Sequence, residues 1–165
     1  MFKTNIKKLI VTVCCVGICV FALAGCSQLG LPATAADAEK AATYAYFAEV
    51  NSVVNEFKTT IGDFSSDVKE KNVDSLKDKV DACDKLVNKF SKLDVPKNCE
   101  DVHKLYTDGL VQMQQALSNY VQIYSDFVNG SIDNGVLNQR VVDVQSSYNQ
   151  GLELLSQADK IAAQK

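Results

Sequence analysis

The chain contains few side chains that could carry acid–base or metal chemistry, and His103 is the first of them. It is the only histidine among 165 residues, which excludes any site that needs two histidines. An imidazole titrates near neutral pH, so His103 could serve as a general base or as a ligand for a metal or haem iron. Met113 cannot complete a haem site with it, because ten residues of helix separate the two side chains by about 15 Å. The simpler interpretation is a side chain at the start of a helix that packs against the loop around Pro96.

A second candidate for chemistry is a row of aspartates whose spacing would weakly attract a divalent cation. The row consists of Asp74, Asp78, Asp81 and Asp84, of which the first three could share one helix face and attract the cation. Lysines are interleaved with these aspartates, so the sequence predicts a solvated charged helix face and no metal site. No cofactor and no catalytic residue is assigned. The chain is predicted not to be an enzyme, and an enzyme that uses His103 is kept as an alternative.

The first 25 residues differ in composition from the remainder. Three lysines, Lys3, Lys7 and Lys8, precede an uncharged apolar run from Leu9 to Leu23. The run is shorter than the roughly 20 residues that a membrane-spanning helix needs. A short apolar segment behind lysines is typical of a secretory signal peptide. The alternative is an uncleaved membrane anchor.

The residues after this run, Leu23-Ala24-Gly25-Cys26, resemble the lipobox of bacterial lipoproteins. The resemblance implies that Leu23, Ala24 and Gly25 are recognised by a signal peptidase, which removes residues 1–25. It also implies that Cys26 carries the lipid (diacylglyceryl and palmitate chains) as the first residue of the mature protein. More than one acyl chain anchors a protein stably. The expected location is therefore the cell membrane, facing away from the cytoplasm, or an outer membrane where the host has one.

Cleavage would leave two of the six cysteines outside the signal peptide and the lipid anchor. These are Cys83 and Cys99, in a compartment where disulfides persist. A bond between them would close a loop of about 15 residues and stabilise the fold by about 3 kcal/mol. The sequence predicts this disulfide, and two buried thiols are the alternative. Two thiols without CxxC spacing do not form a zinc site.

Composition restricts the class of the remaining chain. Hydrophobic residues make up 47% and charged residues 22%, with a formal net charge of −3. The chain is too apolar to be disordered and too charged to be a polytopic membrane protein, and it lacks the basic excess of a typical nucleic-acid binder. Loss of the three signal-peptide lysines would make the body more acidic still, which argues against electrostatic attachment to anionic lipid.

Apolar residues recur with helical spacing through four segments after residue 36. The expected helices run from 37 to the low 60s or further, from 73 to 92, from 98 to 128 and from 133 or 134 to 163. Gly62 or the pair Ser65-Ser66 is expected to end or bend the first helix, and Gly130 and Ser131 to end the third. Short connections between long helices favour an all-α, antiparallel, up-down four-helix bundle over residues 37–165. Residues 26–36 are expected to form the lipidated cysteine and a flexible tether.

Two sets of polar side chains are candidates for contacting a partner or ligand. One is an uncharged face on the third helix, formed by Gln112, Gln114, Gln115, Asn119 and Gln122. The other is the group of six tyrosines, which are expected to pack in the core and which alternatively line a cavity for a small ligand. They are Tyr44, Tyr46, Tyr106, Tyr120, Tyr124 and Tyr148.

The middle of the chain loosely resembles small helical lipoproteins of uncharacterised function from Gram-positive bacteria. The resemblance rests on Leu93, Val95-Pro96, Cys99 and Val102-His103, and it implies no known activity. The expected function is a non-enzymatic binding or structural module of the cell envelope, anchored to the membrane through Cys26. An envelope protein is its expected partner, and no nucleic acid is expected.

Overall fold

The computed structural model of the chain describes residues 34–70 and 73–165, and all the regular structure in these ranges is helical. The four α-helices are α2 (Ala35–Glu70), α3 (Val73–Phe90), α4 (Glu100–Val128) and α5 (Asn134–Ala162), and a 3-10 turn, η1 (Lys97–Cys99), precedes α4. The described ranges contain no strand. The prediction of an all-α fold is confirmed.

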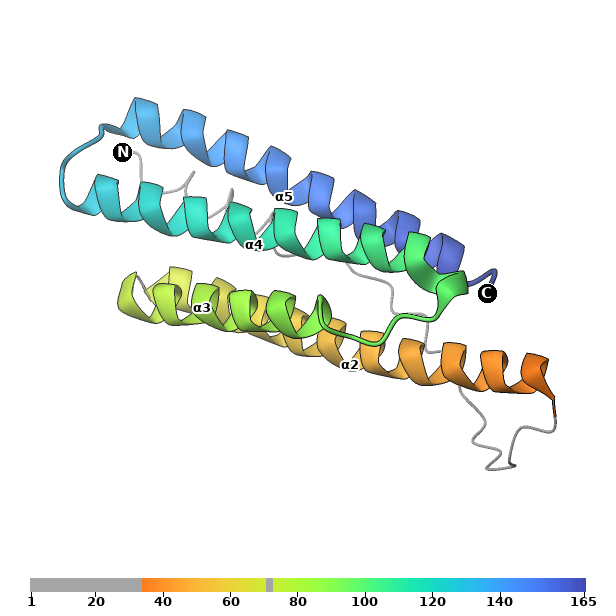
Figure 1. Cartoon of the computed structure of the whole chain (residues 1–165). Coiled ribbons are helices and arrows are strands. Elements are labelled where there is room, and N and C mark those ends of the chain that lie inside the picture. Colours follow the sequence, from red (N-terminus) through yellow and green to blue (C-terminus); the bar gives the residue numbers. More distant parts are fainter. Residues whose placement is uncertain (1–33, 71–72) are drawn as a thin grey trace.

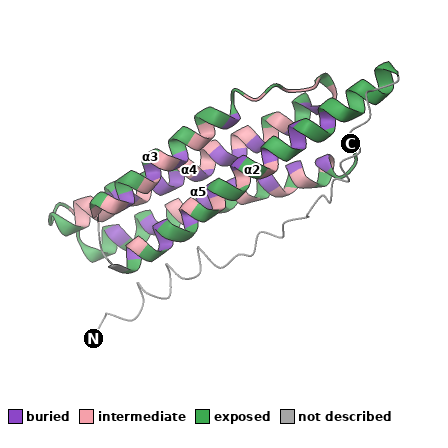
Figure 2. Cartoon of the chain, turned by 90° about the horizontal axis from the view of Figure 1, so that it is seen from below, coloured by how far each residue is buried: buried purple, intermediate pink, exposed green. Residues whose placement is uncertain are grey.

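The helices lie in two layers, with α4 beside α5 in one and α2 beside α3 in the other (Figure 1). The most extensive backbone packing is between α4 and α5, and α3 also packs on both α2 and α4. Turning the molecule shows that the buried residues lie along the facing sides of the helices (Figure 2). The apolar stripes in the sequence therefore form the surfaces on which the helices meet.

Helix α2 begins at residue 35, earlier than expected, because Thr34 caps it. The Thr34 hydroxyl oxygen accepts a hydrogen bond from the Asp37 backbone N–H at 3.2 Å, and the hydroxyl donates to the Asp37 carboxylate at 2.7 Å. A side chain that satisfies a free N–H in the first turn stabilises the start of a helix. The predicted tether, residues 26–36, therefore overlaps the helix by two residues.

Helix α2 does not end at Gly62 or Ser65-Ser66 but continues to Glu70, so the longer of the two expected lengths is correct. Phe64, Ser65 and Val68 are buried in this last part. The Ser66 hydroxyl donates to the Gly62 carbonyl at 3.3 Å, one helical turn back. The buried stripe therefore continues through the weak helix formers and outweighs their low propensity.

The other helix ends follow local chemistry that is visible in the sequence. Helix α3 ends at Phe90, two residues before the expected Lys92, and α4 begins after Pro96 and the turn η1. At the end of α4, Gly130 adopts φ 73°, and the Ser131 N–H donates to the Asp126 carbonyl at 2.8 Å. This left-handed glycine with a 6→1 hydrogen bond is a Schellman motif. The Asp133 carboxylate then caps α5 by accepting from the Val136 N–H.

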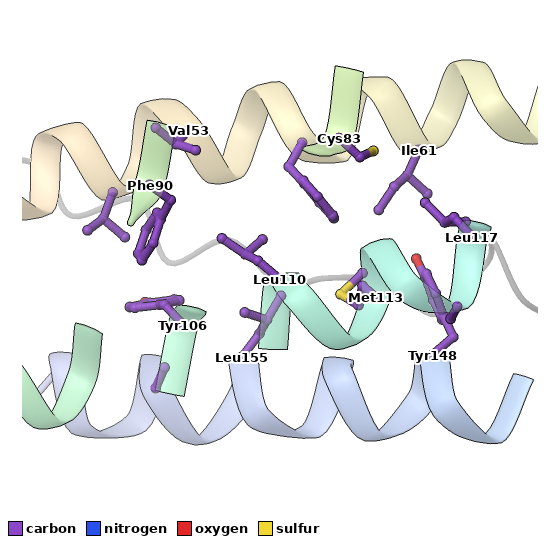
Figure 3. Packing of buried hydrophobic residues seen from close by; sticks show 14 of the residues in the cluster. Val53, Ile61, Cys83, Phe90, Tyr106, Leu110, Met113, Leu117, Tyr148 and Leu155 are labelled. Carbon is purple, nitrogen blue, oxygen red and sulfur yellow. The ribbon is translucent and has the colours of Figure 1, made fainter. Parts of the chain in front are cut away.

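The core contains most of the predicted stripe positions and some residues between them. Phe57, Leu76, Phe90, Leu110 and Met113 are all at most 1% exposed. The close-up shows side chains from all four helices meeting along the interior (Figure 3). Several stripe residues are only half buried, among them Val54, Val87, Tyr120 and Tyr124.

Two glycines allow α4 and α5 to pack closely. A Cβ atom at Gly109 would lie 3.0 Å from the Gly151 carbonyl oxygen, and one at Gly151 would lie 2.9 Å from the Gly109 carbonyl oxygen. Both distances are shorter than ordinary van der Waals contact. The two helices can therefore approach this closely only because both positions lack a side chain.

Candidate functional site

His103 lies in an aromatic cluster at the end of the molecule where α4 begins. Its ring stacks on Phe90 of α3, with centroids 4.9 Å apart and planes 7° from parallel. Its Nδ1 is 3.1 Å from the Tyr46 hydroxyl of α2. The ring is therefore held by two other helices, rather than resting on the loop around Pro96 alone.

Burial makes the neutral forms of this cluster the favoured ones. Desolvation lowers the pKa of His103, since a half-buried imidazolium loses part of its hydration. Burial, with smaller contributions from Cys99 and Asp101, raises the pKa of the Tyr46 hydroxyl. A neutral imidazole accepting from a neutral phenol at Nδ1 fits both shifts.

A second polar pair extends the cluster toward α5. The Tyr106 hydroxyl donates to the Asp159 carboxylate, and the Tyr106 ring packs against Phe90 with centroids 6.0 Å apart. Burial, followed by the hydrogen bond to Asp159, raises the pKa of Tyr106. The Tyr106 ring is 5% exposed. Phe90 thus touches both His103 and Tyr106, and the cluster ties together all four helices.

The arrangement suits packing better than nucleophilic chemistry. A catalytic nucleophile needs a depressed pKa or a base placed beside it. The thiol nearest in sequence, Cys99, is fully buried, and burial raises its pKa. Sequence reasoning missed Tyr46 and Asp159 as members of the cluster. Tyr46 directly precedes the stripe residue Phe47, and that adjacency was the only available signal.

The predicted Cys83–Cys99 disulfide is wrong, because both thiols are free and buried. Asn98, beside Cys99, donates to Thr43 near the start of α2 at 3.1 Å. Cys83 lies in α3 between Lys79 and Lys89, which pair with Asp63 and Glu56 farther along α2.

Along α2, Thr43 lies beside Cys99 and the stretch from Glu56 to Asp63 lies beside Cys83. At least thirteen residues separate these two parts of α2, which corresponds to about 20 Å of helix. A disulfide requires Cα atoms within about 7 Å. The connection between α3 and α4 runs toward the start of α2 (Figure 1), rather than returning along α3 as expected. Burial raises the pKa of Cys83 to about 12.

The aspartates of α3 lie along its outer surface, where Asp74, Asp78 and Asp81 are exposed. The Asp84 carboxylate accepts a hydrogen bond from Asn88 at 3.0 Å. Within residues 34–70 and 73–165 no group of three His, Cys, Asp or Glu side chains is placed to hold a metal ion.

The tyrosines are spread along the bundle rather than gathered in one place. Tyr44 is 64% exposed, whereas its neighbour in sequence Tyr46 is 2% exposed beside His103. Farther along, Tyr120 and Tyr124 stack on each other with centroids 6.2 Å apart, and Phe64 meets the edge of the Tyr120 ring. Tyr148 is buried in α5, on the side of Leu117 and away from Phe90 and Tyr106 (Figure 3).

The uncharged surface predicted on α4 continues onto α5. Gln112 donates to Ser147 at 2.9 Å and to Gln150 at 3.3 Å. We call this surface the amide face; it consists of Gln112, Gln115, Asn119 and Gln122 of α4 and Ser147 and Gln150 of α5. Gln114 does not belong to it, because two residues of helix turn its side chain about 200° from Gln112.

The lipobox residues Leu23, Ala24, Gly25 and Cys26 lie outside the described residues. Among the helices that are described, none has an apolar stretch of the length and hydropathy that a bilayer crossing requires.

Comparison with known proteins gives no relative for this chain. No protein-family model matches the sequence, and no curated protein and no solved structure matches it.

Proposed function

We propose that the chain is a lipid-anchored extracytoplasmic protein whose helical domain is a non-enzymatic binding or structural module of the cell envelope. The observation that carries the proposal is the segment Leu23-Ala24-Gly25-Cys26 behind three lysines and an uncharged apolar run. A lipid on Cys26 would place the first turn of α2, capped by Thr34, within nine residues of the membrane surface. The extended chain covers at most about 3.5 Å per residue, so the domain would stay close to the bilayer.

We further propose that the four helices form an antiparallel, up-down bundle. Contacts between α2 and α3 join Glu56 to Lys89 and Asp63 to Lys79, so residue numbers rise along one helix as they fall along the other. Contacts between α4 and α5 follow the same rule, for example Tyr106 with Asp159 and Arg140 with Asp126.

Contacts between α2 and α4 support the same topology from a different direction. Tyr46 meets His103, and Phe64 meets Tyr120. Residue numbers here rise together, as expected when the first and third helices of an up-down bundle run parallel.

A binding or structural role agrees with the packing and protonation of the side chains that catalysis would need. The His103 cluster is packed against Phe90 and bonded to Tyr46, and both thiols have raised pKa values. Burial of these groups favours their neutral forms and opposes acid–base or nucleophilic work.

The anchor is tested by labelling growing cells with palmitate and fractionating them. The wild-type chain should carry label and sediment with membranes, whereas Cys26→Ser should lose the label and leave the membrane fraction. Cys19→Ser, a cysteine change within the apolar run, is the matched control and should behave as wild type. Cys26→Ser protein that stays in membranes at its mature size would overturn the anchor.

The binding role is tested by crosslinking the full-length protein in cells and identifying what is captured by mass spectrometry. A single envelope component, or a second copy of the chain, should be recovered repeatedly. Its loss when Gln115 is replaced by a charged residue, but not when Asn55 on α2 is, would support the amide face as the binding surface. Uniform, non-specific capture by both variants would count against the role.

A further inference from the structure

The amide face lies in a part of the domain that carries no charge. Neither residues 109–125 of α4 nor residues 144–152 of α5 contain a Lys, Arg, Asp or Glu, although such residues make up 22% of the chain. The hydrogen bonds from Gln112 to Ser147 and Gln150 join the two charge-free segments side by side. Gln115, Asn119, Gln122 and Gln150 are exposed around this junction. The uncharged zone is therefore one continuous surface over two helices.

The charged residues that flank this zone have partners within the same molecule, and those next to the α5 segment, Asp143 and Glu153, accept hydrogen bonds from Gln139 and Gln157. Lys104 pairs with Asp108 at one end of α4. Arg140 lies 3.6 Å from Asp126 at the other end. The outer surface of α3, in contrast, has alternating aspartates and lysines along its length. The α4 side of this zone, which has no charged residue between Asp108 and Asp126, is thus the part of the domain that a second molecule can approach without burying a charge.

The net charge of the chain and the hydrogen-bonding groups of the amide face together indicate which partner would bind there. The chain is acidic, with a net charge of −3 that becomes more negative without the signal-peptide lysines. Two copies repel each other through most surfaces, but not where neither carries charge. A primary amide both donates and accepts hydrogen bonds, so a surface of glutamines and asparagines is complementary to itself. Self-complementarity is what a two-fold symmetric contact requires, and depletion of charge is the compositional mark of interface centres.

We propose that the amide face is a docking surface for a second copy of this chain, which pairs through it about a two-fold axis. The inference deepens the proposed binding role and rests on it, since it names the partner.

The first test places one cysteine on the amide face of the full-length protein in membranes. Asn119→Cys, treated with a bismaleimide crosslinker, should give a product of twice the mass that contains this chain alone. Asn55→Cys, exposed on α2 in the other layer, is the matched control and should give none. Cys83 and Cys99 are buried and should not react. Absence of the product from Asn119→Cys, or equal amounts from both variants, would overturn the proposal.

The second test uses charge, and it separates lost docking from lost folding. Gln115→Glu and Gln115→Lys, each alone, should weaken self-association of the detergent-extracted full-length protein about tenfold or more, because like charges then face each other. An equal mixture of the two variants should restore association in sedimentation analysis. Association of Gln115→Glu at the wild-type level, or a mixture no stronger than its components, would contradict the two-fold pairing.

The outcomes distinguish this inference from the proposed function beneath it. A crosslinked product at Asn119→Cys that contains a different envelope protein would overturn the pairing of two copies and leave the binding role standing. Loss of the membrane anchor in Cys26→Ser concerns the proposed function alone, because the detergent-extracted protein needs no anchor to associate.

Discussion

His103 illustrates, at the scale of single residues, how a candidate for chemistry becomes part of a core. The only histidine of the chain stacks on Phe90, and its Nδ1 faces the Tyr46 hydroxyl. A hydrogen bond between two partly desolvated groups contributes more to stability than the same bond in water, and losing one partner leaves the other unsatisfied. The pair therefore matters to folding even without any role in catalysis.

We expect Tyr46→Phe to lower the free energy of unfolding by about 1 kcal/mol. The ring and its packing stay, while the bond to the imidazole of His103 is lost. Chemical denaturation followed by circular dichroism measures the difference.

Tyr44→Phe is the matched control. It removes the same hydroxyl oxygen two residues earlier in the chain, from a side chain that is 64% exposed. It should leave the stability unchanged. Equal effects of the two substitutions would show that the Tyr46–His103 contact does not contribute.

At the scale of the helices, the closest contact is made by the residues with the least side chain. Gly109 and Gly151 place the backbones of α4 and α5 against each other, and a Cβ at Gly151 would also lie 2.6 Å from the Met113 side chain. Met113 can move, since it is flexible, but the Gly109 carbonyl belongs to the backbone. A methyl group at this point therefore has to push the helices apart.

We expect Gly151→Ala to lower the free energy of unfolding by about 1–3 kcal/mol, although alanine is the better helix former. Thermal unfolding of the variant and the wild type gives the difference.

Gly62→Ala should do the opposite and stabilise the domain by up to about 1 kcal/mol, because no atom lies within 4 Å of the added Cβ in the middle of α2. If both glycine variants shifted the stability in the same direction, the close approach of α4 and α5 would not be the cause.

The helices could be predicted from the sequence because apolar residues repeat along each of them. The end of α4 and the start of α5 could be predicted because Gly130 and Asp133 end and cap a helix through neighbouring residues alone. The early start of α2 at Thr34 was equally local, since a threonine three residues before Asp37 forms the cap. The continuation of α2 through Gly62 and Ser65 is not determined by neighbouring residues, because it depends on burial of Phe64 and Val68 against other helices.

The candidate site was harder to predict than the helices. His103 stood out by its chemistry, but Tyr46 lies 57 residues away and joins it only through the packing of α2 on α4. The same limit explains the wrong disulfide: loop length permits a Cys83–Cys99 bond, whereas the direction of residues 91–96 along the bundle does not.

At the scale of the whole molecule, the two thiols report on whether the domain is folded. Cys83 and Cys99 are both fully buried, and neither is bonded. Raised pKa values further slow their reaction, since the thiolate is the reactive form.

We expect a water-soluble thiol reagent to leave Cys83 and Cys99 unmodified in the native protein and to modify both after denaturation, as counted by mass spectrometry. A reducing agent should not change the melting temperature, because there is no disulfide to break. A melting temperature that falls on reduction would show instead that the bond forms.

The length of the α4–α5 hairpin has a consequence for where the molecule could act. The start of α2, the α3–α4 connection and the C-terminus lie at one end, and the turn between α4 and α5 lies at the other (Figure 1). Helix α4 has 29 residues, which span about 43 Å. With the proposed lipid at the Thr34 end, the turn would stand some distance above the headgroups, beyond the reach of proteins that lie flat on the bilayer. The length of the bundle would then limit how far from the membrane its far end can meet other molecules.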